Sequence, residues 1–193
     1  MRTSSFYRPL AAFQFASRAA RRLSGDRRGT TAIEFALVAV PFFIFVFGII
    51  GISLHHYITN SLDNAVDVAS RKIRTCQAQK GNVTVAQFKD MVHAEASGMI
   101  DKSKLRILIQ KSSNWADIAP ADCVSGSGVM TASTGGDGDL VAAHAGGAGD
   151  VVVLTACYEW ELAQKLGVFQ MGDLSNGSAV MRAATTFRTE PCS

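Results

Sequence analysis

The 193-residue chain has no ionisable side chain between Phe35 and Leu54. A soluble core helix of that length normally carries a polar stripe, whereas here only proline, glycine and serine interrupt a run of aliphatic residues and phenylalanine. Residues 35–54 in a helix rise about 30 Å, which matches the hydrocarbon core of a bilayer. The missing charges therefore argue against a buried core helix and predict a membrane-spanning helix over 35–54.

Motifs of catalysis and cofactor binding are also missing from the sequence. No G-x-S-x-G string is present to form a nucleophile elbow, and no glycine-rich phosphate loop precedes a predicted helix. His93 and His144 stand far from any recognisable nucleophile motif. We therefore predict that the protein is not an enzyme, with no catalytic residues, no cofactor and no small-molecule substrate.

Patterns that hold metal ions are weak. None of the cysteines belongs to a C-x-x-C pair, which argues against a zinc site or a thioredoxin-like motif. His55 and His56 are adjacent, and adjacent side chains on a helix point in different directions. Asp137, Asp139 and Asp150 lie among glycines, but their spacing fits no EF-hand and the acid at the twelfth position is missing. We expect interfacial histidines, solvated loop acids and no metal site.

Acidic residues are scarce at the N-terminus, where residues 1–29 hold seven arginines and the single acid Asp26. Of the 19 basic and 16 acidic residues in the chain, 12 and 15 remain from Thr30 onward, a net charge of −3. The positive-inside rule places the basic arm in the cytoplasm and exports the part beyond Leu54. The overall charge of +3 belongs to the arm, so it does not indicate binding to nucleic acid.

Three processing schemes compete for the first thirty residues. A secretory signal peptide has an apolar region of roughly 7 to 15 residues and a small-x-small cleavage site. The apolar run here is longer, and Gly51-Ile52-Ser53 fits such a site only loosely. The arginine-rich, acid-poor arm also imitates an organellar transit peptide. The third scheme cleaves on the cytoplasmic side, before the span, and leaves the span in the mature protein.

One acid, Glu34, stands at the start of the apolar run. A carboxylate opposes insertion by a few kcal/mol near a bilayer centre and by less near an interface, so we interpret Glu34 as functional. The alternative is a carboxylate that only reaches the headgroups. Further along, Pro41 has no amide hydrogen to bond the Leu37 carbonyl, and it predicts a local kink in the helix.

The string Arg28-Gly29-Thr30-Thr31-Ala32-Ile33-Glu34-Phe35, followed by the apolar run with Pro41, resembles the TadE-like pseudopilins of tight-adherence (Flp/Tad) pilus systems. The resemblance covers roughly residues 27 to 70. It implies cleavage between Gly29 and Thr30 by a prepilin peptidase, after which Glu34 and Phe35 are the fifth and sixth residues. The glutamate would face the α-amino group of a neighbouring subunit, because opposite charges compensate each other's desolvation.

The same resemblance implies a minor pilin-like protein that acts in pilus assembly or secretion. It would be a single-pass protein of the bacterial inner membrane with a cytoplasmic N-terminus and a periplasmic C-terminal domain. Expected partners are the membrane, prepilin peptidase, other pilin-like subunits and the pilus assembly platform. The alternative is an unprocessed, membrane-anchored periplasmic scaffold or adhesin. A secreted enzyme released by signal peptidase is a third possibility that would require catalytic residues.

Beyond the span, apolar residues recur at three- and four-residue steps, as on one face of a helix. They are Leu54, Ile58, Leu62, Ala65, Ala69, Ile73 and Cys76. Asp63, Asp67 and Arg71 step by four along the other, solvated face. Residues 1–29 are the predicted basic leader, and residues 30–78 are a second, helical segment. We predict that one long helix in this second segment leaves the membrane and packs its apolar stripe on a globular domain.

We predict that residues 79–193 form that globular domain. The predicted fold class is α+β. Thr84 and Gln87 form a capping box, which opens a short helix with Val85, Phe88, Val92 and Ala96 inward. Alternation and β-branched content predict strands over 104–110, 150–160 and 178–189, with a short helix or turn over 161–169. The strands form a small antiparallel sheet on the long helix. The Gly/Ser-rich segment 111–149 is expected to be a mobile excursion or a partner-facing flap.

The four cysteines are Cys76, Cys123, Cys157 and Cys192, and all lie on the predicted exported side. Disulfides form and persist there, and a domain of this size has a marginal core. We predict two structural disulfides, for which three connectivities are possible. Cys157 with Cys192 and Cys76 with Cys123 is one such pairing, and the sequence does not decide among them.

Overall fold

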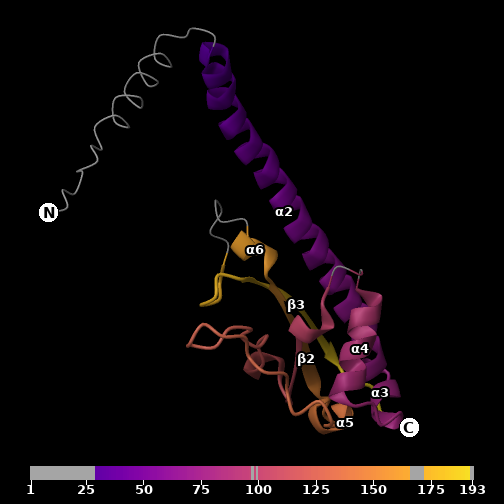
Figure 1. Ribbon diagram of the computed structural model, residues 1–193. Coiled ribbons are helices and arrows are strands. Elements are labelled where there is room, and N and C mark those ends of the chain that lie inside the picture. The colour runs from indigo at the N-terminus through magenta and orange to yellow at the C-terminus, as the bar shows by residue number, and fades with distance from the viewer. Residues whose placement is uncertain (1–28, 97, 99, 166–171, 192–193) are drawn as a thin grey trace, which may run out of the picture. The chain divides into compact units, whose positions relative to one another are not determined.

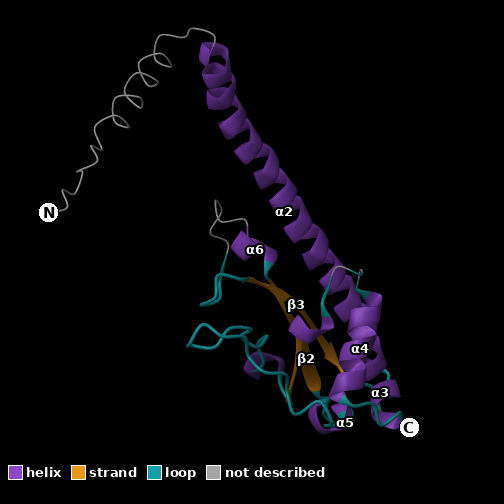
Figure 2. Cartoon of the chain, viewed as in Figure 1, coloured by secondary structure: helices purple, strands orange, loops and turns teal. Residues whose placement is uncertain are grey.

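The computed structural model describes residues 29–96, 98, 100–165 and 172–191 (Figure 1). The basic arm, Cys192 and the end of the predicted 161–169 turn lie outside these residues. The described elements are α2 (Thr30–Arg74), α3 (Gln77–Lys80), α4 (Val85–Glu95), η2 (Lys102–Lys104), β1 (Leu105–Ser112), η3 (Trp115–Asp117), α5 (Val141–His144), β2 (Val151–Trp160), α6 (Leu162–Lys165) and β3 (Ala179–Arg188). A long helix followed by a three-stranded antiparallel sheet confirms the α+β prediction (Figure 2).

Helix α2 is continuous over 45 residues, or about 68 Å. It contains Pro41 in its interior, and the kink expected there stays a prediction. The chain divides between Phe47 and Gly48 into two compact units, so the helix contributes to both. The helix ends before Cys76, whose backbone adopts the left-handed conformation (φ 60°) that terminates helices.

The sheet has the order β1-β2-β3, with β2 antiparallel to both neighbours. In this register Ala156 of β2 pairs with Ile107 of β1 and with Ala183 of β3. Residues Val151 to Tyr158 of the central strand are all buried, because both faces of β2 are covered. Strand β3 instead alternates, with Met181, Ala183 and Phe187 buried. This alternation is the one predicted for 178–189.

The larger of two apolar clusters in the second unit joins α2, α4 and the sheet. The predicted α2 stripe contributes buried residues from Ile58 to Ile73, and it packs in the same cluster as the sheet residues Leu105, Leu154 and Met181. Charges on the other helix face remain exposed, and Arg71 lies 3.6 Å from Asp67 in an i,i+4 ion pair. The predicted stripe and the solvated face are therefore confirmed.

Helix α4 begins at the predicted capping box. The Thr84 hydroxyl accepts a hydrogen bond from the Gln87 amide at 3.2 Å, and the Thr84 amide donates to Gln87 Oε1 at 3.0 Å. These two bonds satisfy amides that have no partner within the helix. Val85, Phe88 and Val92 are buried in the core as predicted.

The segment 111–149 is tied to the rest of the domain, so the expectation of a mobile excursion is wrong, whereas the alternative of a partner-facing flap stays a prediction. The Ile107 amide of β1 donates to Ser133 Oγ at 3.1 Å, and the Ile109 amide donates to Thr134 Oγ1 at 2.8 Å. Strand β1 is an edge of the sheet, and its outward amides need partners. The segment supplies side-chain hydroxyls as acceptors for these amides. Such contacts require no repeating pattern of apolar residues, so the sequence did not reveal them.

Candidate functional site at the start of the long helix

The predicted processing site lies where the regular backbone begins. Gly29 is exposed immediately before α2, and a Cβ placed on it would meet no atom within 4 Å among the described residues. Thr30 is the first residue of α2 and is also exposed. The peptide bond between Gly29 and Thr30 therefore separates the basic arm from the helix, and neither residue is covered by the described part of the chain.

The predicted register residues follow on the first two turns of α2. Glu34 is exposed, and no cation of the described residues lies within 4.0 Å of its carboxylate. Its neighbour Phe35 is 71% exposed. The Glu34 carboxylate and the adjacent Phe35 ring are therefore both left uncovered by the described part of the chain.

Large apolar side chains are exposed around the whole circumference of the first half of α2. They are Ile33, Phe35, Leu37, Val38, Val40, Phe42, Phe43, Ile44, Phe45, Phe47, Ile49, Ile50 and Ile52. In the described part of the chain, α2 is the one helix that is long and apolar enough to cross a membrane. Since so much contiguous apolar surface is unfavourable in water, this half of α2 is a candidate membrane span.

The cysteines follow a different pairing from the one considered above. Cys123 is bonded to Cys157 of the central strand, so the pairings Cys157 with Cys192 and Cys76 with Cys123 are wrong. Leu108 packs with this disulfide on the sheet face opposite α2. Cys76 is also disulfide-bonded, and Cys192 lies beyond the described residues. The prediction that Cys123 and Cys157 form disulfides is confirmed.

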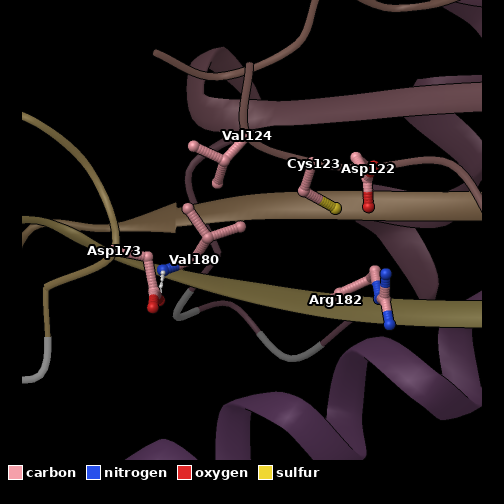
Figure 3. A pocket seen from close by; sticks show the side chains of 6 residues that line it. All are labelled: Asp122, Cys123, Val124, Asp173, Val180 and Arg182. Carbon is pink, nitrogen blue, oxygen red and sulfur yellow. Dashed lines mark hydrogen bonds between the residues drawn. The ribbon is translucent and has the colours of Figure 1, made fainter. Parts of the chain in front are cut away.

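A pocket opens beside this disulfide (Figure 3). Asp122 comes from the segment that follows β1, Asp173 precedes β3, and Arg182 projects from β3. Asp173 Oδ2 accepts a hydrogen bond from the Val180 amide at 3.0 Å, so this carboxylate fixes the entry into β3. The only sulfur atom shown belongs to Cys123, which is in a disulfide and offers no thiolate nucleophile. The pocket therefore has polar walls, but its lining does not combine a nucleophilic side chain with a general base.

The loop acids close turns. The Gly136 amide donates to Asp139 Oδ2 at 3.1 Å, and the Gly147 amide donates to Asp150 Oδ2 at 2.8 Å. Within residues 29–96, 98, 100–165 and 172–191, no three metal-ligating side chains come together. The His55 ring lies 5.9 Å from the ring of Trp160 in an edge-on contact, so this histidine packs against β2.

Sequence reasoning missed one group of residues around a second pocket, which lies between α4, the start of β1 and the segment 132–137. Lys89, Ser103, Arg106, Ser133 and Asp137 line it, together with Ala132 and Gly135. A signal for Lys89 was present, because its position falls between the inward residues Phe88 and Val92 on the helix face that carries Val85. No sequence pattern indicated that Lys89 would line a pocket together with residues of the irregular segment.

Comparison with known protein families finds a match in the N-terminal half of the chain. Residues 29–71 match the family described as TadE-like protein. The match begins at Gly29, includes Glu34 and Pro41, and ends near the C-terminal end of α2. Neither the curated proteins nor the solved structures contain a match to the chain.

Proposed function

We propose, because residues 29–71 are TadE-like in sequence, that the chain is a minor pilin-like component of a Flp/Tad pilus assembly system. The observation that carries the proposal is the coincidence of this match with the exposed, apolar first half of α2. The TadE-like match indicates a role in Tad pilus assembly. The finer role is that of a pseudopilin whose contribution is to pack with other subunits, without catalysis.

Membrane anchoring follows from the length and surface of α2. About 20 helical residues cross a bilayer, whereas α2 has 45. The exposed residues from Ile33 to Ile52 would lie in hydrocarbon, where their contact with water is removed. The remaining turns, whose stripe is buried in the α+β domain, would stand outside the bilayer. The seven arginines of the arm favour a cytoplasmic N-terminus, with the domain in the periplasm of the inner membrane.

Processing after Gly29 is the second part of the proposal. A peptidase cleft must accommodate an extended backbone, and glycine presents no side chain to it. Gly29 is exposed and stands just outside α2, which supports access to the bond between Gly29 and Thr30. Cleavage by prepilin peptidase would remove the basic arm and place a new α-amino group at Thr30, four residues before Glu34.

Glu34 would then set the register of assembly. An isolated carboxylate at the edge of an apolar helix is costly, and an ammonium group from a neighbouring subunit would compensate that cost. The described residues supply Glu34 with no such cation. The exposed Phe35 ring beside it would add apolar contact to the same helix packing. Other pilin-like subunits and the assembly platform are the partners that this arrangement fits.

The test compares Glu34→Gln with a control, Glu95→Gln, in cells that carry the matching peptidase and pilus system. Glu95 is an exposed acid at the end of α4, so the control removes the same charge from the α+β domain and leaves the apolar run unchanged. We expect the Glu34 variant to insert in the membrane but to lose co-purification with other pilin-like subunits and surface pili. Normal co-purification and piliation in this variant would contradict the register role.

A further inference from the structure

Lys89 is a buried cation that has no counter-ion in direct contact within the described residues. Its side chain lies on the inward side of α4 and is only 9% exposed. Among the residues described, none accepts a hydrogen bond from the Lys89 ammonium, and no carboxylate lies within the 4.0 Å of an ion pair. A buried charge without a partner is unfavourable, so its retention needs a reason. The ammonium faces the second pocket described above.

A second cation lines the same pocket. Arg106 is in β1, and its Nη1 donates to the carbonyl oxygens of Ser103 and Leu105 at 2.7 and 3.1 Å. These bonds hold the guanidinium in place, and its other N–H groups have no hydrogen-bond partner within the described part of the chain. Burial first, and then the Arg106 guanidinium, lower the pKa of Lys89. The two cations therefore repel each other across the pocket.

The remaining walls suit a small polar group. Ser133 Oγ accepts a hydrogen bond from the Ile107 amide at 3.1 Å, which leaves the hydroxyl hydrogen available to a ligand. Ala132 and Gly135 add little bulk, and Gly135 has a positive φ of 67°. Asp137 is the one acid in the lining, and it opposes the effect of Arg106 on Lys89 without forming an ion pair with it. Two cations and one acid leave the pocket with a net positive charge.

We infer that this pocket is a binding site for an anionic oxygen group, a carboxylate or a phosphate, held by Lys89, Arg106 and the Ser133 hydroxyl. Charge-assisted hydrogen bonds to an oxyanion are the strongest that these donors form, and an anion would relieve the repulsion between the two cations. The site lies in the α+β domain and depends neither on the family match nor on the processing of the N-terminus. The proposed assembly function includes no ligand site in this domain, so the site is an addition to that function.

The test uses the full chain in detergent micelles with ¹³Cε-labelled lysine. The Lys89 signal is assigned by its absence in Lys89→Gln, and it is followed by NMR during titration with sodium phosphate, with sodium acetate, and with sodium chloride at matched ionic strength. We expect a saturable shift with phosphate, acetate or both, and none with chloride. Phosphate alone identifies a phosphate group as the ligand, and acetate alone identifies a carboxylate.

Two further variants make the result specific. Arg106→Gln should weaken the apparent affinity about tenfold, the effect of losing one charge-assisted bond of about 1.5 kcal/mol. Lys111→Gln removes an exposed lysine of β1 outside the pocket and should leave the midpoint unchanged. The proposal would be overturned if the Lys89 chemical shift fails to saturate or if chloride reproduces it. It would also be overturned if Arg106→Gln leaves the midpoint of the titration unaltered. Because these readouts are in the wild-type and Arg106 proteins, poor folding of Lys89→Gln does not decide the outcome.

Discussion

The disulfide between Cys123 and Cys157 fastens the long irregular segment to the central strand of the sheet, with the two Cα atoms 5.6 Å apart. Cys157 is fully buried in β2, and Cys123 is nearly so. Together with Leu108 they form a small apolar cluster on the sheet face opposite the long helix. The bond therefore helps to cover the sheet face away from α2, and it limits the freedom of a chain segment that is rich in glycine and serine.

Removal of this disulfide should destabilise the domain. The loop between the two cysteines spans 34 residues, and closing a loop of that length contributes about 3 to 4 kcal/mol in the chain-entropy account. We expect Cys123→Ala/Cys157→Ala to lower the free energy of unfolding by about that amount in chemical denaturation of the full chain in micelles. The double variant avoids an unpaired thiol. An unchanged unfolding midpoint would show that the segment is held by its other contacts.

Thr155 offers a stabilising substitution. Its hydroxyl is completely buried in β2 and has no hydrogen-bond partner among the described residues. Thr155→Val keeps the shape of the side chain and removes the unpaired oxygen, so we expect a gain of about 1 kcal/mol in the free energy of unfolding. Thr186→Val, at an exposed position of β3, should change it by less than about 0.5 kcal/mol. A loss of stability in Thr155→Val would mean that the hydroxyl is satisfied.

The capping box of α4 should contribute measurably to stability. Thr84→Ala removes the acceptor for the Gln87 amide, and loss of such a cap costs about 1 kcal/mol. Thr84→Ser retains the hydroxyl and serves as the matched control. Denaturant unfolding of the two variants should therefore separate them by most of that difference, whereas equal midpoints would argue that water replaces the cap.

The pH dependence of stability should carry a contribution from Lys89. Burial and then Arg106 and Lys102 lower its pKa below the ordinary 10.5, while Asp137 and Asp90 act in the opposite direction. Between the two pKa values the unfolded chain binds more protons at Lys89 than the folded chain does. The free energy of unfolding therefore rises as pH rises through this window below 10.5.

Lys89→Gln removes that contribution, so the stability advantage of this variant over the wild type should shrink as pH rises toward 10.5. Unfolding curves at a series of pH values measure this difference. Lys111→Gln corrects for the loss of one positive charge. A difference between Lys89→Gln and wild type that stays constant across the window would contradict the effect of the buried environment.

The sequence predicted those parts of the fold in which periodicity is set by burial. The stripe on α2 from Ile58 to Ile73 and the alternation in β3 were correct because one face of each element meets a single core. The capping box was correct because it is local in sequence, with Thr84 three residues before Gln87. The division into leader, helical segment and domain stays a prediction.

The irregular segment 111–149 is where sequence reasoning failed. Its hydroxyls bond the outer edge of β1, and Cys123 reaches β2, but neither contact requires a repeating pattern in the segment itself. The pocket around Lys89 was missed for a related reason. A lysine on the inward face of α4 was visible in the sequence, whereas the neighbours that make it a site come from β1 and from this segment. Glu34, by contrast, was singled out because it is the one acid at the entrance of an apolar run.

The central claim is that the chain is processed after Gly29 and keeps its apolar helix as a membrane anchor. The most direct test is the intact mass and N-terminal sequence of the protein recovered from membranes of cells that carry the matching peptidase. The account predicts a mature chain that begins at Thr30 and is found with the membranes. A chain that begins at Met1 would favour an unprocessed scaffold or adhesin, and a chain that begins after Ser53 would contradict the anchored assembly role.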